Sequence, residues 1–176
     1  MRTLINHHLP IDDHMGFSRT LIIGNCGSGK SWLAQNLSAR LNIPFHDLDR
    51  YHWLESSYSA ARGAGEAIAL TTQAAQQDTW IMEGVYGWLA NLATARATTL
   101  VFLNISVAEC IANLEARGPG NGSPENFRAL LQWAKDYPNR QTSTSFNGHS
   151  AIFETFSSRK IILKSRAETA SFLSKL

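Results

Sequence analysis

One stretch, TLIIGNCGSGKSWLAQNL at residues 20–37, restricts the fold more than any other part of this sequence. An apolar run leads directly into GNCGSGKS, and leucines then recur at every fourth position, as on one face of a helix. The eight residues satisfy the pattern G-x-x-x-x-G-K-[ST] in full, between a predicted strand and a predicted helix, as that pattern requires. The stretch therefore predicts a strand, a glycine-rich loop and a helix in immediate succession.

The chemistry of this loop predicts a binding site for the phosphates of a nucleoside triphosphate. Glycines let successive backbone N–H groups point at a phosphate, and the helix start adds its positive dipole end. Lys30 is expected to reach the β- and γ-phosphates, and Ser31 to place its hydroxyl on Mg²⁺. The guanine-reading pattern Asn-Lys-x-Asp does not occur in the sequence, so ATP and Mg²⁺ are the predicted cofactors. The predicted nucleotide-binding residues are Gly24, Asn25, Cys26, Gly27, Ser28, Gly29, Lys30, Ser31 and Trp32.

The two cysteines, Cys26 in the loop and Cys110 in a predicted helix, favour a reducing cytoplasm over a disulfide framework. Because Cys26 lies near a helix N-terminus, its thiol is either a reactive group of lowered pKa or a small loop residue. We expect the second, in which only the backbone N–H of Cys26 serves the nucleotide.

Composition indicates one ordinary globular domain, with 176 residues, 44% hydrophobic and 17% charged. The net charge of +2 is spread without a dense basic tract, which argues against a nucleic-acid binder. The sequence has no apolar run near the ~20 residues that span a bilayer, and residues 1–17 lack the pattern of a secretory signal. We expect an N-terminal extension over 1–17 and a single domain over 18–176, with no membrane segment.

The remaining apolar runs predict an α/β protein with a parallel sheet. Five short runs are almost continuously hydrophobic, as in strands covered on both faces: 20–24, 45–48, 80–83, 100–105 and 160–163. Helical patterns separate them, at 60–75 and after the capping residues Ser106, Ser123 and Ser165. Two longer excursions interrupt the alternation, and we expect 49–77 to be a substrate-side insertion and 118–159 to be a lid region.

Acidic residues follow two predicted strands, at the sheet edge where ligands of parallel α/β proteins gather. Asp49 comes directly after 45–48 and is expected to accept a proton from an attacking hydroxyl, to bind the substrate or to hold Mg²⁺ through water; the alternative is an exposed charged turn. Asp47 lies two residues earlier, on the same side of an extended strand. Glu83 ends the run 80–83 and is either a group that orients magnesium-bound water or a surface glutamate. The predicted metal site is therefore Ser31, Asp49 and Glu83.

Arginines lie in and next to the predicted lid, and phosphoryl transfer uses such charges on the moving group. Arg117 ends a predicted helix before GPGNG, Arg128 lies on the next helix, and Arg140 follows YPN. We expect at least one of them to reach the phosphates, and the turn 164–166 to lie near the nucleotide base. The predicted catalytic residues are Lys30, Asp49, Arg117 and Arg140.

Five segments in order resemble a group of small P-loop kinase-like proteins named DNA topology modulation proteins: GNCGSGKS, LD with the HW after it, WIMEGVY, YPNR and IILKS. These proteins are similar to adenylate and shikimate kinases, and the resemblance covers residues 18–176. It implies a three-layer P-loop NTPase fold with a five-stranded parallel sheet in nucleoside-monophosphate-kinase order and a lid over ATP. It carries Gly24, Gly29, Lys30 and Ser31 to the phosphate and magnesium site, Asp49 to the family aspartate and Arg140 to an arginine after the lid helix.

The chain departs from that group in the glycine-rich loop, where Ser31 stands in place of threonine and Trp32 in place of a small residue, and also at two further positions and in its lid. Glu83 stands where aspartate is common, Val85 stands where asparagine is common, and the lid segment RGPGNGSPEN has few basic residues. We expect an ATP-dependent kinase for a small-molecule acceptor, with a nucleotide or nucleoside as one candidate. The alternatives are an ATPase or nucleotide-binding switch, for which water is the acceptor, and a DNA-binding regulator. The sequence leaves the oligomeric state open.

Overall fold

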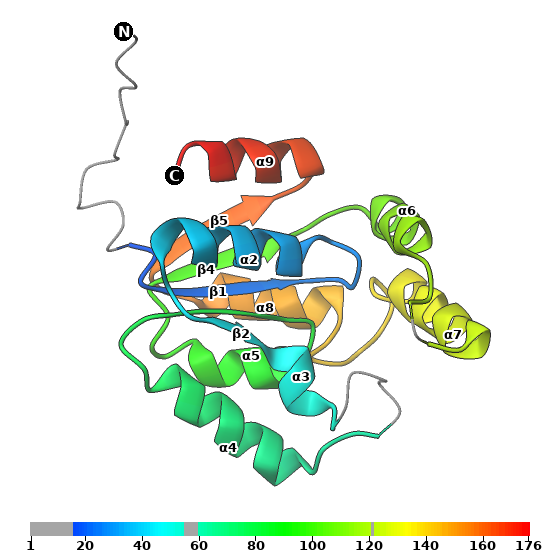
Figure 1. Ribbon diagram of the computed structural model, residues 1–176, viewed down its shortest axis with the longest axis horizontal. Helices are drawn as coiled ribbons and strands as arrows, with labels where there is room; N and C mark the ends of the chain where they lie inside the picture. The colour runs from blue at the N-terminus through cyan, green and yellow to red at the C-terminus, as the bar shows by residue number, and fades with distance from the viewer. Residues whose placement is uncertain (1–15, 55–59, 121) are drawn as a thin grey trace, which may run out of the picture.

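The computed structural model describes residues 16–54, 60–120 and 122–176, in which each strand is followed by one or more helices (Figure 1). The strands are β1 (Arg19–Gly24), β2 (Phe45–Asp47), β3 (Trp80–Gly84), β4 (Thr99–Leu103) and β5 (Arg159–Leu163). The helices are α2 (Lys30–Leu41), α3 (Leu48–His52), α4 (Ala64–Ala75), α5 (Gly87–Ala93), α6 (Val107–Arg117), α7 (Pro124–Lys135), α8 (Phe146–Thr155) and α9 (Arg166–Ser174).

The five strands form one parallel sheet in the order β2-β3-β1-β4-β5. Strand β1 lies at its centre, where Ile23 aligns with Gly84 of β3 and Gly24 aligns with Leu103 of β4. This register brings the carboxyl ends of three strands to one edge, where the glycine-rich loop begins. The predicted α/β class with a five-stranded parallel sheet is confirmed.

Helices cover both faces of the sheet, which gives three layers (Figure 1). On one face, Leu33 and Leu37 of α2 are buried with Ile22, and the same core includes residues of α9. On the other face, α4, α5 and α8 cover Leu21 and Ile23. Because successive strand residues point to opposite faces, β1 contributes to both cores and is apolar at consecutive positions.

The first described residues already pack against the core. Phe17, the last residue of the predicted 1–17 extension, is buried and packs edge-on against Phe172 of α9, with ring centroids 5.9 Å apart. Residues 1–15 of that extension lie outside the described part of the chain. In the described residues, none of the helices has the length and apolar character needed to cross a membrane.

Two strands end earlier than predicted, each because a capping residue starts a helix. Strand β2 ends at Asp47, whose carboxylate accepts hydrogen bonds from the N–H groups of Asp49 and Arg50, so Leu48 is already helical. Strand β4 ends at Leu103, before residues 104–105, and Ser106 then caps α6 by accepting from the N–H of Glu109 at 3.2 Å. The predicted caps at Ser123 and Ser165 are also confirmed.

The predicted helix over 60–75 begins four residues late, at Ala64. The preceding residues form an antiparallel bridge between Ala61 and Trp53, and Gly63 then takes the N-cap position. Local pairing within this insertion therefore overrides the helix propensity of its first alanines.

The predicted lid region 118–159 contains two different structural parts. Helix α7 packs against α6 beyond the edge of the sheet, whereas α8 packs on β1, β4 and α5 and belongs to a main layer (Figure 1). The sequence analysis did not predict α8, which is capped by Ser145 and buries His149 and Ile152. Only the part before α8 is therefore available to act as a lid.

Candidate functional site

The glycine-rich loop joins β1 to α2 through backbone conformations that require glycine. Gly24 has a φ of 152° and Gly27 a φ of 77°. A Cβ on Gly24 would lie 2.6 Å from the carbonyl oxygen of Leu103, and one on Gly27 would lie 2.3 Å from that of Cys110. Both positions exclude side chains by contact as well as by conformation, so neighbouring elements hold the loop in its turn.

The lysine and serine of the motif lie at the start of α2, as predicted. Lys30 is 5% exposed, and its Nζ donates to the carbonyl oxygen of Asn25 at 2.9 Å, so the ammonium lies against the backbone of the loop. The Ser31 hydroxyl donates to Oε1 of Glu83 at 2.6 Å. Glu83 belongs to β3 and is 1% exposed, which excludes the interpretation as a surface glutamate.

Glu83, which is buried, and Asp49, which is half-buried, form a pair of carboxylates near Lys30. Burial raises the pKa of Glu83 to about 7, because the charge of Lys30 offsets only part of the desolvation and Asp49 adds repulsion. Burial likewise raises the pKa of Asp49 to about 6, against the opposing effect of Lys30. Oε2 of Glu83 is buried without a hydrogen-bond partner among the described residues.

These oxygens fit a hard cation held next to a phosphate. Carboxylate and hydroxyl oxygens are the ligands that Mg²⁺ prefers, and the unpartnered Glu83 oxygen gives one of them a free lone pair. In the described part of the chain, no three histidine, cysteine or acidic side chains are grouped to hold a metal by themselves. A magnesium ion here would therefore take further ligands from phosphate and water, as it does in phosphoryl-transfer sites.

Asp49 and Asp47 have different roles because the chain changes from strand to helix between them. The predicted strand through residue 49 is not present, because β2 ends at Asp47 and Leu48 begins α3. Asp47 caps α3 and pairs with Arg50 at 3.6 Å. Oδ1 of Asp49 instead accepts from the N–H of Val85, just after β3, at 3.2 Å. A Cβ on Gly84 would lie 3.3 Å from that oxygen and 2.8 Å from the Cβ of Leu48. Glycine at position 84 therefore lets α3 pack closely against the end of β3.

A cavity of about 790 Å³ lies beside the loop. Its walls come from residues 27–32, the last turns of α6 and the first turns of α9. Trp32, which is 50% exposed, Arg117 and Arg166 all line it. Its volume suits a nucleoside-sized ligand. Arg117 and the last residue of the turn 164–166 thus lie beside the loop.

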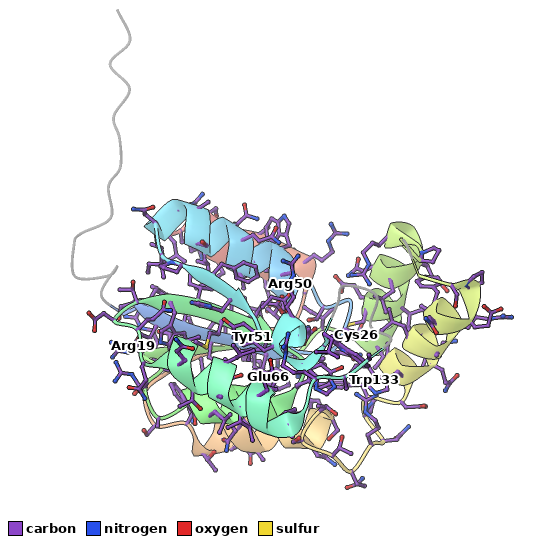
Figure 2. All side chains as sticks on the ribbon, turned by 60° about the horizontal axis from the view of Figure 1, so that its bottom comes forward. Arg19, Cys26, Arg50, Tyr51, Glu66 and Trp133 are labelled. Carbon is purple, nitrogen blue, oxygen red and sulfur yellow. The ribbon has the colours of Figure 1, made fainter. Side chains whose placement is uncertain are left out.

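Arg140 does not extend into that cavity. Its guanidinium donates to the carbonyl oxygens of Trp133 and Thr144, and lies 3.8 Å from the centre of the Trp133 ring. Its charge acts on Cys26, whose pKa is nevertheless raised because burial outweighs Lys30 and Arg140. In Figure 2, Cys26 and Trp133 lie at the same end of the molecule, next to α7, far from Arg19. Arg128, by contrast, pairs with Glu125 at 3.0 Å, and both side chains are 72% exposed.

Two asparagines tie the loop to α6 and α7, and the sequence analysis did not predict these contacts. Nδ2 of Asn25 donates to the carbonyl oxygen of Ala134 at 3.0 Å, while its Oδ1 accepts from the N–H of Cys26 at 2.9 Å. Nδ2 of Asn113 donates to the carbonyl oxygen of Gly27 at 2.9 Å. An asparagine inside a glycine-rich loop was the available signal, because its amide can bond backbone at two places.

Comparison with known proteins shows that the chain has the P-loop kinase fold. A shikimate kinase from Bacteroides thetaiotaomicron is 18% identical, with a TM-score of 0.55 over 89% of this chain and 94% of that chain. A gluconokinase from Sinorhizobium meliloti 1021 is 16% identical, with a TM-score of 0.54 over 90% and 93%. The YorR protein from Bacillus subtilis, solved in complex with phosphorylated GDP, is 17% identical, with a TM-score of 0.50 over 89% and 96%. The chain matches no protein-family model.

Proposed function

We propose that this protein transfers the γ-phosphoryl group of ATP to a hydroxyl group of a small molecule. The observation that carries the proposal is the position of Asp49, which Val85 holds at the end of β3 beside Lys30 and Glu83. A bare phosphate-binding loop needs no such carboxylate, whereas transfer to a hydroxyl needs a group that accepts its proton. The fold is also that of solved small-molecule kinases.

Each residue of the site has a role in the proposed mechanism. The loop backbone and Lys30 bind the phosphates, and Ser31, Glu83 and Asp49 would hold magnesium directly or through water. Mg²⁺, when bound, supplies positive charge to the β- and γ-phosphate oxygens. With a pKa of about 6, Asp49 is ionised at neutral pH and orients the acceptor hydroxyl or takes its proton.

The cavity beside the loop is the proposed site of the nucleoside part of ATP. Trp32 offers an aromatic face for the base, and Arg117 and Arg166 offer planar cations. Arg140 is proposed to act at the phosphates after lid closure, which requires it to leave the carbonyl oxygens of Trp133 and Thr144. Closure of 118–145 over the loop would exclude water from the transfer.

An ATPase or nucleotide-dependent regulator is the second candidate function. The observation that favours it is the engagement of Arg140, because an arginine held by its own segment leaves less charge for the γ-phosphate. Water would then take the place of the acceptor. The narrower resemblance to DNA topology modulation proteins stays a prediction, as does a nucleotide or nucleoside acceptor.

The deciding experiment measures ADP release from Mg·ATP with and without a panel of nucleosides, nucleoside monophosphates and sugar acids. The kinase proposal expects one class to stimulate release and to appear as a phosphorylated product. Lys30→Ala is expected to abolish turnover, and Lys175→Ala, a change at an exposed lysine near the C-terminus, to leave it unchanged. Slow release that no acceptor alters would favour the ATPase, and full activity of Lys30→Ala would contradict both functions.

A further inference from the structure

A buried histidine contacts the backbone just after β3, at Val85. His149 of α8 is 0% exposed, although it carries two polar ring nitrogens. Nε2 lies 3.0 Å from the carbonyl oxygen of Val85, and Nδ1 lies 2.7 Å from the hydroxyl of Tyr137. A buried imidazole costs free energy unless both nitrogens are hydrogen-bonded, and here both are.

The partners of His149 fix its tautomer. The carbonyl oxygen of Val85 can only accept, so Nε2 carries the hydrogen and donates it. Burial lowers the pKa of His149 to about 3, so the ring is neutral and Nδ1 accepts from the Tyr137 hydroxyl. The ring therefore has one defined orientation, set from two sides.

The bond to Val85 connects this histidine to the acid of the site. Val85 is 4% exposed, and its two backbone polar groups have two different partners. Its carbonyl oxygen accepts from His149, and its N–H donates to Oδ1 of Asp49 at 3.2 Å. The direction of that N–H, and with it the orientation of the carboxylate, depends on how Val85 is held after β3 ends.

We propose that His149 is a positioning residue, which holds Val85 so that its N–H orients the Asp49 carboxylate toward the acceptor. Tyr137, just beyond α7, supports the histidine from the side of the lid. The proposal rests on the proposed function, since it assigns a purpose to the orientation of Asp49. An aliphatic residue of similar volume would fill the same space but could not hold the peptide carbonyl.

The first test compares His149→Leu, His149→Gln and the control Ile152→Ala. Glutamine keeps an N–H group that can donate to Val85, whereas leucine keeps only a side chain of similar volume. The control removes apolar packing from the same face of α8. His149→Leu is expected to lower kcat by about 10- to 100-fold at unchanged affinity for an ATP analogue. Gln is expected to restore most of the rate. Equal losses in kcat and nucleotide affinity, shared by Ile152→Ala, would mean that His149 only supports the fold and would overturn the proposal.

The second test needs no acceptor, so it separates this proposal from the kinase function. Hydrogen exchange of the Val85 amide is expected to be slow in the wild type and faster by about 10-fold or more in His149→Leu. Nitrogen NMR shifts are expected to report the Nε2–H tautomer of His149. Unchanged exchange, or the Nδ1–H tautomer, overturns the positioning role even in an active kinase. If the exchange rates and the tautomer are as expected but no acceptor stimulates ADP release, only the kinase proposal is rejected and the positioning role of His149 stands.

A variant that keeps the ring covers the case in which His149→Leu does not fold. Tyr137→Phe removes only the hydroxyl that donates to Nδ1. It is expected to speed exchange of the Val85 amide and to lower kcat less than His149→Leu. Wild-type values of both quantities in Tyr137→Phe would overturn the proposal, whereas near-wild-type values in His149→Gln are the expected result, because glutamine keeps a donor for Val85.

Discussion

The Ser31 hydroxyl donates a 2.6 Å hydrogen bond to Glu83, which joins the first turn of α2 to the end of β3. Ser31 is the motif residue proposed to contact magnesium, so Glu83 lies one hydrogen bond from the expected ion. Glu83→Gln keeps an oxygen that accepts from Ser31 but removes the charge. We expect the apparent affinity for Mg²⁺ in turnover to fall by about 10- to 100-fold, measured by magnesium titration at saturating ATP. The exposed Glu154→Gln is the control, and an unchanged titration would remove Glu83 from the metal site.

Asp49→Asn tests the proposed acid–base residue directly. Asparagine preserves an oxygen for the Val85 N–H, so the local structure is expected to persist while the proton acceptor is lost. Turnover is expected to fall by about 10²- to 10⁴-fold with little change in ATP affinity. The measurements are steady-state kinetics and calorimetric binding of a non-hydrolysable ATP analogue, with Asp78→Asn as the control. Equal losses in turnover and affinity would make Asp49 a structural residue.

Trp32 is expected to report nucleotide binding, because its ring lines the cavity beside the loop and is 50% exposed. ATP should change its fluorescence, and Trp32→Ala should weaken nucleotide binding by about 1–3 kcal/mol through loss of stacking. Ile68→Ala, which removes another exposed apolar side chain on α4, is the control. Undiminished affinity in Trp32→Ala would place the base elsewhere.

Cys26 is expected to be dispensable for nucleotide binding. Burial raises the pKa of its thiol, so at neutral pH the side chain is not an activated thiolate. Cys26→Ala should therefore bind the ATP analogue as the wild type does, and iodoacetamide should modify Cys26 slowly at pH 7. Rapid alkylation or a large loss of affinity would contradict the interpretation of Cys26 as a small loop residue.

His149 is expected to make stability fall in acid. Its pKa is about 3 when folded, because burial, Lys30 and Arg140 disfavour the cation, and about 6.5 when unfolded. The unfolded chain therefore binds more protons between these values, so the free energy of unfolding decreases as pH falls below 6.5, by up to about 1.4 kcal/mol per pH unit.

The comparison with His149→Gln isolates this effect. Glu83 has the opposite effect on how the free energy of unfolding changes with pH. Its raised pKa makes the folded chain bind more protons than the unfolded chain up to about pH 7. Urea unfolding of both proteins at pH 5 and pH 7 gives the difference. The wild type should lose more stability between these pH values than the variant, and parallel losses would mean that His149 is accessible to protons in the folded state.

The fold and the glycine-rich loop could be predicted from sequence because their signals are local. The motif at 24–31 fixes strand, turn and helix within eight residues, and the five apolar runs all became strands. Glu83 and Asp49 could be placed at the same edge because parallel strands end together. What the sequence did not reveal is that Glu83 is buried and bonded to Ser31, since that depends on the order of the strands in the sheet.

The roles of Asp47, Arg140 and His149 needed the structure because each depends on a distant or competing partner. The sequence does not show whether the chain from Asp47 to Asp49 is a strand or the start of a helix. The structure shows that Asp47 caps a helix. Arg140 has many rotamers, and its stacking on Trp133 cannot be read from their spacing. His149 lies 64 positions from Val85 in the sequence, without a pattern that connects them.

The central place of β1 also sets the order of events during biosynthesis. Arg19–Gly24 leaves the ribosome first, but its neighbours β3 and β4 begin only at Trp80 and Thr99, more than fifty residues later. At about 5–20 residues per second, the strand that carries the phosphate loop stays without a sheet for several seconds. Helix α2 follows β1 at once and can cover one face of it, whereas the helices of the other face begin only at Ala64. We therefore expect that second apolar face of β1 to be where a nascent-chain chaperone binds.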